Sequence, residues 1–112
     1  MLLLAVQMLS PWQTVQLTGG EFIICHGRTN DPDHRVCHVD SDGCVLSSYG
    51  GSMGSGTQQM NVPAHVAVAR NNGFVYVVDH HNYRVLLLSP ALNYVREVPT
   101  CDLIMHIIVL PV

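Results

Sequence analysis

Histidines and cysteines are concentrated in one part of the chain, where their number suggests a zinc site. Six of these side chains lie between positions 25 and 44: Cys25, His26, His34, Cys37, His38 and Cys44. A structural zinc site needs four ligands that converge in a tetrahedron. Cys37 and His38 are adjacent in a run of strand type, so we expect their side chains on opposite faces of a sheet. The spacing also matches neither a zinc ribbon nor a CxxC pair, and we predict no metal site and no cofactor.

A second polar group separates two apolar runs, and its residue types indicate a structural clasp. Asp79, Asn82 and Arg84 occur at fixed offsets in the segment DHHNYR. A turn aspartate accepts hydrogen bonds from backbone N–H groups, and an asparagine tolerates a positive φ. Arg84 follows the turn, from where its guanidinium can reach back to the Asp79 carboxylate in a charge-assisted pair. We expect these three residues to hold the turn together.

The other residues of this turn are candidates for contact with a partner. His80, His81 and Tyr83 stand at the tip of the expected hairpin, and loop residues on a rigid scaffold often carry binding. The sequence contains no nucleophile elbow, P-loop or HExxH motif and no pair of carboxylates at catalytic spacing. We therefore predict no catalytic residues, and we expect the chain itself not to be an enzyme.

Short β-strands are expected on both sides of the turn. The run Phe74–Val78 contains only β-branched and aromatic residues, and Val85–Leu88 is the returning apolar run. Such residues favour strands, and continuous apolar runs indicate strands that are covered on both faces. Gly73 opens the hairpin and Ser89 closes it together with the following proline, so length and flanking residues favour strands over a buried helix.

Composition limits the chain to one domain with extensive burial. Of its 112 residues, 48% are hydrophobic and 12% are charged, and the net charge is −3. All five basic residues are scattered arginines, so the sequence has no basic stripe for nucleic acid. The cysteines suggest reduced thiols in the cytoplasm, with a secreted disulfide framework as the alternative. Neither end supplies the ~20 apolar residues of a membrane span, and we expect no membrane contact.

The sequence contains two copies of one unit, and each unit is expected to form four short strands. The segment Ser10–Leu17 aligns with Val62–Ala69, and three further segments align in the same order. A repeat of about 50 residues with four strands is typical of a β-propeller blade. We predict an all-β partial propeller with two four-stranded antiparallel blades. The expected parts are 1–9 as a remnant or strand of a preceding blade, 10–50 as the first blade, 51–61 as a Gly/Ser-rich loop between blades, 62–98 as the second blade, and 99–112 as the start of a further blade or a tail.

The second unit resembles the NHL repeat, which builds β-propellers in many tripartite-motif (TRIM-type) ubiquitin ligases. Its pattern P-x-x-V-A-V, followed by G-x-V-Y-V-x-D-x-x-N-x-R-V, is matched at Pro63, Val66, Val68, Gly73, Val75, Tyr76, Val77, Asp79, Asn82, Arg84 and Val85. The first unit keeps fewer of the positions: Pro11, Gly20, His34, Arg35, Val36, Gly43 and Tyr49. It departs from the pattern at its longer hairpin turn, where Cys25 or His26 stands in the place of Asp79.

The resemblance implies a non-catalytic protein-interaction module, a piece of the substrate-binding propeller of a TRIM-type ligase whose RING and B-box domains lie elsewhere. The partner would be a protein. Further blades or further copies of the chain are also expected, because two blades are fewer than the 4–8 that close a propeller. Two alternatives remain open: an RNA-binding NHL propeller, which the acidic net charge disfavours, and a fragment of a peptidylglycine amidating-lyase-like propeller enzyme.

Overall fold

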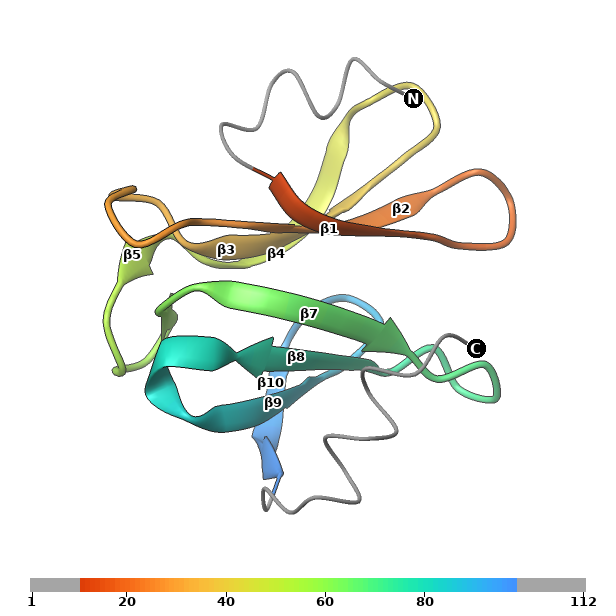
Figure 1. Ribbon diagram of the computed structural model, residues 1–112. Helices are drawn as coiled ribbons and strands as arrows, with labels where there is room; N and C mark the ends of the chain where they lie inside the picture. The colour runs from red at the N-terminus through yellow and green to blue at the C-terminus, as the bar shows by residue number, and fades with distance from the viewer. Residues whose placement is uncertain (1–10, 99–112) are drawn as a thin grey trace.

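The computed structural model describes residues 11–98, which form an all-β chain with two four-stranded sheets (Figure 1). The first sheet comprises β1 (Pro11–Gln16), β2 (Phe22–His26), β3 (Arg35–Val39) and β4 (Val45–Gly50). The second sheet comprises β7 (Pro63–Val68), β8 (Val75–Asp79), β9 (Arg84–Leu88) and β10 (Tyr94–Val98). In both sheets neighbouring strands are consecutive and antiparallel. The predicted all-β class with two such units is confirmed, whereas the parts predicted for 1–9 and 99–112 lie outside the described residues.

The connection between the sheets is more ordered than the plain loop expected for 51–61. It contains two short strands, β5 (Ser52–Met53) and β6 (Gln59–Met60), which pair in parallel. The Gly54 N–H donates to the Met60 carbonyl over 3.1 Å. Backbone polar groups need such partners, and the glycines allow the chain to fold back and supply them locally. A Gly/Ser-rich composition therefore does not mean that this segment lacks structure.

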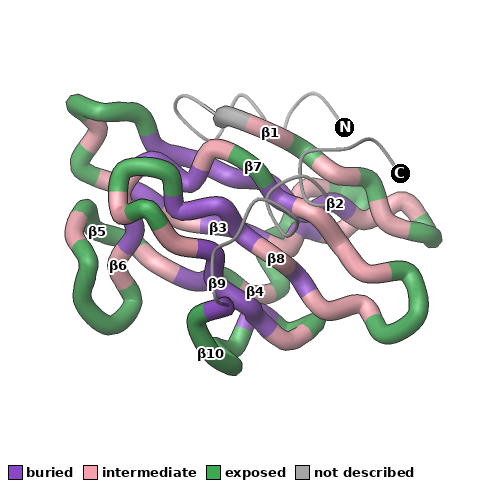
Figure 2. The backbone as a smooth tube through the Cα atoms, turned by 60° about the horizontal axis from the view of Figure 1, so that its bottom comes forward, coloured by how far each residue is buried: buried purple, intermediate pink, exposed green. Residues whose placement is uncertain are grey.

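One hydrophobic core lies between the two sheets and joins them. Its members come from both sheets and from the segments next to the second: Ile23, Cys25, Val36, Tyr49, Met60, Val66, Val75, Val77, Leu86, Leu88 and Leu92. Separate apolar clusters lie on the opposite face of each sheet and include Ile24 and Val78. Because successive strand residues point to opposite faces, continuous apolar runs supply both layers. Figure 2 shows the buried residues along the strands and the exposed ones mainly at the turns.

The inner strands β1 and β7 lie side by side, although they are far apart in the sequence (Figure 1). The Gln13 side-chain oxygen accepts the Val66 backbone N–H over 2.5 Å, which satisfies a donor on the edge of the second sheet. This arrangement brings three segments to one end of the molecule: 27–34, 51–62 and 79–84. We call this end the clasp end.

Candidate interaction site at the clasp end

The three side chains that were predicted to form a clasp lie together in the structure. Asp79 is completely buried at the end of β8, directly opposite Arg84 in the β8–β9 ladder. Its Oδ2 accepts a hydrogen bond from Arg84 Nε over 2.7 Å and another from Asn82 Nδ2 over 2.8 Å. The buried carboxylate is therefore paired with a cation and hydrogen-bonded, as a charge in the interior must be.

The clasp also binds the connection between the sheets, which sequence reasoning did not foresee. Asp79 Oδ1 accepts the backbone N–H of Asn61 over 2.6 Å, so this donor lies outside the turn where it was expected. Further donors reach carbonyl oxygens of the connection: Arg84 to Ser55 (3.2 Å) and Gln59 (2.9 Å), and Asn82 to Gly54 (2.8 Å). One buried carboxylate thus fixes both the hairpin and the chain that enters the second sheet.

The tip of the hairpin is a short 3-10 helix, η1 (His80–Asn82), rather than a simple tight turn. The His80 N–H donates to the Val62 carbonyl and the His81 N–H to the Asn61 carbonyl, each over 3.0 Å. Both histidine side chains are exposed, and their ring centroids are 5.1 Å apart. The backbone of the tip is therefore anchored to the connection while the two imidazoles remain open to solvent.

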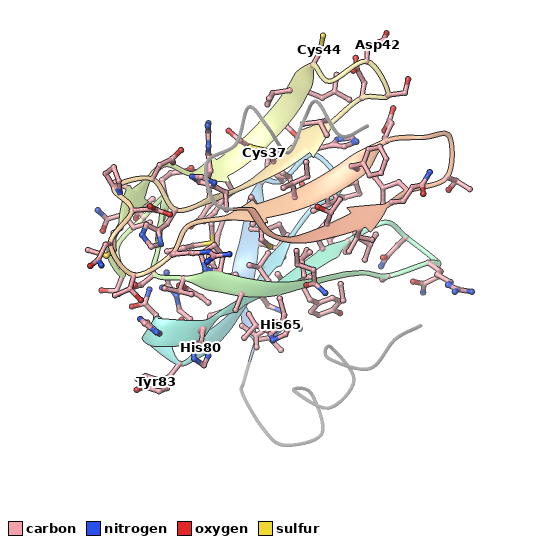
Figure 3. All side chains as sticks on the ribbon, turned by 45° about the horizontal axis from the view of Figure 1, so that its top comes forward. Cys37, Asp42, Cys44, His65, His80 and Tyr83 are labelled. Carbon is pink, nitrogen blue, oxygen red and sulfur yellow. The ribbon has the colours of Figure 1, made fainter. Side chains whose placement is uncertain are left out.

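Tyr83 is also strongly accessible, with an exposed fraction of 87%. It leaves η1 in the left-handed region with φ 52° and ψ 44°. Asn82, which would tolerate a positive φ, stays in the helical turn with its amide bonded to Asp79, and the turn ends one residue later at Tyr83. Figure 3 shows Tyr83 and His80 at the margin of the second sheet, far from Cys44 and Asp42 of the first.

Replacing Tyr83 with glycine is expected to raise the free energy of unfolding by roughly 0.5–1 kcal/mol, because a left-handed conformation strains an L-residue and glycine removes this strain. The exposed side chain contributes little packing that would be lost. Leu92 is the matched control, since it also has a positive φ (64°) but is 2% exposed. Leu92→Gly should lower the stability, by about 2 kcal/mol, because a buried side chain is removed. Urea denaturation measures both, and a loss of stability in Tyr83→Gly would contradict the left-handed strain at Tyr83.

In the first sheet His26 takes the position of Asp79, opposite Arg35 in the ladder, and His34 makes the connecting bond there. His34 aligns with Tyr83 in the repeat and was expected as a turn residue. Its side chain is completely buried. Its Nδ1 lies 2.9 Å from the Val62 backbone nitrogen and its Nε2 lies 2.7 Å from the Asp31 carbonyl oxygen. Neighbouring backbone amides at the start of the second sheet are therefore bound from two sides: Asn61 by Asp79 and Val62 by His34.

The remaining cysteines and histidines are dispersed. Cys25 belongs to the core between the sheets, Cys37 lies on the opposite face of the first sheet and Cys44 is exposed (Figure 3). Burial raises the pKa of the Cys25 and Cys37 thiols, which keeps them protonated and poorly reactive. His38 Nε2 contacts Glu21 Oε1 over 2.7 Å. Among residues 11–98 no three His, Cys, Asp or Glu side chains gather as metal ligands.

A cleft of about 980 Å³ lies between the sheets at the end opposite the clasp. Strands β1 and β7 line it together with the turns that follow them, and Glu21 and His38 form part of one wall. Arg70 lies on the other wall. None of the predicted contact residues lines this cleft. Sequence reasoning missed it because its walls meet only when the sheets pack: Gln13 on one wall and Val66 on the other are 53 positions apart in the chain.

No protein-family model and no curated protein matches the chain. In the part of the chain that the structure describes, no helix is long and apolar enough to cross a membrane. The function must therefore be inferred from the geometry of the clasp end, where an ordered network presents exposed aromatic and imidazole side chains.

Proposed function

We propose that the chain is a protein-interaction module, formed by two blades of an NHL-type β-propeller, which binds a protein partner through residues 80–83. The observation that carries this proposal is Tyr83, which is 87% exposed in a left-handed conformation. Strained backbone persists where the surrounding structure holds it, and it is concentrated at functional sites. Here the buried Asp79 supplies that hold by binding Asn61, Asn82 and Arg84.

A fixed exposed tyrosine suits the binding of a protein. An aromatic ring offers a large apolar area with a polar tip, and a backbone that is already ordered loses little conformational entropy on binding. His80 and His81 flank the ring and add donors and acceptors. The loop therefore combines an apolar anchor with polar groups that orient a partner.

The assignment of the sheets as propeller blades is supported by their apolar faces. Each sheet has one face in the shared core and a second apolar cluster on the other face. Blades of a propeller pack in this way against a neighbour on each side. In the proposal the chain belongs to the substrate-binding region of a TRIM-type ubiquitin ligase, whose RING domain lies outside these residues. The free thiols of Cys25, Cys37 and Cys44 support a reducing compartment such as the cytoplasm.

Photo-crosslinking tests the proposed contact surface directly. A benzophenone amino acid in place of Tyr83 should give discrete protein adducts in a cell extract, and excess wild-type chain should suppress them. The same amino acid in place of Tyr94 is the matched control, because Tyr94 is 52% exposed on β10, outside the proposed contact residues 80–83. Identical adducts from both positions, or none from position 83, would overturn the proposal.

A further inference from the structure

At the clasp end one histidine ring joins the two sheets, and both of its nitrogens are engaged. We call this contact, between His34 and Val62, the joint. His34 Nδ1 faces the Val62 N–H over 2.9 Å, and Nε2 faces the Asp31 carbonyl over 2.7 Å. A backbone amide only donates and a carbonyl only accepts, so the ring must be neutral with its proton on Nε2. A second proton, on Nδ1, would make this nitrogen a donor as well, so that two N–H donors, Nδ1–H and Val62 N–H, would face each other at hydrogen-bond distance.

The residue held by this bond is itself strained. Val62 has φ 58° and is 3% exposed, and a β-branched residue in the left-handed region is a genuine outlier. Its amide is bound by His34 and its carbonyl by the His80 N–H. Loss of the first bond would therefore let Val62 relax, and it would free the anchor of η1 at the same time.

Two glycines pack closely against His34, one beside its ring and one beside its carbonyl group. A Cβ atom at Gly27 would lie 2.7 Å from His34 Nδ1, and one at Gly50 would lie 2.5 Å from the His34 carbonyl oxygen. These two glycines close around the residue from both sides. Backbone therefore packs against the His34 ring on the Gly27 side, and movement of the ring in that direction would displace that backbone.

A second buried histidine in this region also disfavours a positive charge. His26 is 3% exposed, and its Nδ1 has no hydrogen-bond partner in the described part of the chain. Burial lowers the pKa of His26, and Asp33, 3.7 Å from its Nε2, opposes this shift only in part. The titratable and charged groups around the joint are His26, Asp31, Asp33 and Arg35 from the first sheet, and Asp79, His80 and Arg84 from the second.

We propose that His34 is an acid-sensitive lock between the two sheets: uptake of a second proton breaks the His34–Val62 bond, opens the joint at the clasp end and releases the backbone of η1. The lock concerns the chain alone and does not depend on the proposed partner.

The direction of the pH dependence follows from proton linkage. A solvated histidine titrates near pH 6.5. The bonds of His34 to Val62 and Asp31 require a neutral ring, so a second proton is taken up more readily in the opened joint than in the closed one. The closed form therefore loses stability as the pH falls below about 6.5, and it regains this stability at higher pH. Ordinary carboxylates titrate near pH 4, which lies outside this window.

Amide hydrogen exchange followed by NMR on the wild-type chain tests the lock, after correction for intrinsic exchange rates. Between about pH 7.5 and 5.5, protection of the Val62 amide should fall roughly tenfold for one linked histidine, and up to about a hundredfold if His26 also contributes. The amides of Gly51, His80 and His81 should follow, since they bond to His34, Val62 and Asn61. Val77 in the centre of the second sheet serves as the internal reference.

Two further measurements assign the effect to His34. His34→Asn places its Oδ1 near the position of Nδ1, so it keeps an acceptor for the Val62 amide but cannot titrate. It should remove most of the fall, whereas His26→Gln should leave most of it. In the wild type, the ¹⁵N shifts of the His34 ring should report a second proton over the pH interval in which Val62 loses protection. A fall that persists in full in His34→Asn overturns the lock. So does a protonated ring beside a fully protected Val62, which needs no variant to observe.

Discussion

Asp79→Asn is expected to destabilise the protein by about 3–5 kcal/mol, the usual effect of removing one partner from a buried ion pair. Asp79 has no exposed surface, and its two oxygens accept three hydrogen bonds, from Asn61, Asn82 and Arg84. An asparagine has the same shape but only one acceptor oxygen, so its amide group would face a donor. The Arg84 guanidinium would also lose its buried counter-charge.

Urea denaturation measures this effect, and a second carboxylate that faces Arg84 provides the control. Glu97 also faces Arg84, at 4.0 Å, but its side chain is 58% exposed. Glu97→Gln should therefore change the stability by less than about 1 kcal/mol, as is usual for a surface pair. In Asp79→Asn we further expect faster hydrogen exchange in 54–61, because that segment is held by the clasp. Equal effects of the two substitutions would show that burial of the carboxylate is not what stabilises the clasp.

Gly50→Ala is expected to be of comparable severity, at roughly 2–5 kcal/mol, because left-handed strain and steric overlap add together. Gly50 has φ 100°, and an added Cβ would lie 2.5 Å from the carbonyl oxygen of His34. That atom belongs to the backbone, and the same carbonyl accepts the Gly51 N–H over 3.0 Å. The methyl group would therefore push apart the two segments that meet at the joint between the sheets.

Gly19→Ala separates the two contributions. Gly19 has a similar φ of 89°, but an added Cβ would meet no atom within 4 Å. It should lower the free energy of unfolding only by the conformational cost of about 1–2 kcal/mol. Thermal or urea denaturation of both variants gives the difference, and this difference measures how tightly the joint is packed. Equal losses in the two variants would mean that the joint yields easily around Gly50.

The sequence alone specified the hairpin of the second sheet and the class of the fold. The runs Phe74–Val78 and Val85–Leu88 predict two strands, because β-branched and aromatic residues favour a pleated backbone. The pairing of Asp79 with Arg84 was also foreseen. All these contacts join residues close together in the chain, so one short segment of sequence contains every residue needed to predict them. The contact role of His80, His81 and Tyr83 remains a prediction, although the structure exposes all three.

The joint could not be read in the same way, because it depends on how the two sheets are placed against each other. His34 meets Val62 across 28 residues, Asp79 meets Asn61 across 18 and Gln13 meets Val66 across 53. No periodicity in the sequence encodes such pairs, since each forms only after a whole sheet has packed on its neighbour. Local pattern determines which strands form, whereas the shared hydrophobic core determines which polar groups become buried and must find each other. That is why His34, expected only as a turn residue, is the buried acceptor for the Val62 amide between the two sheets.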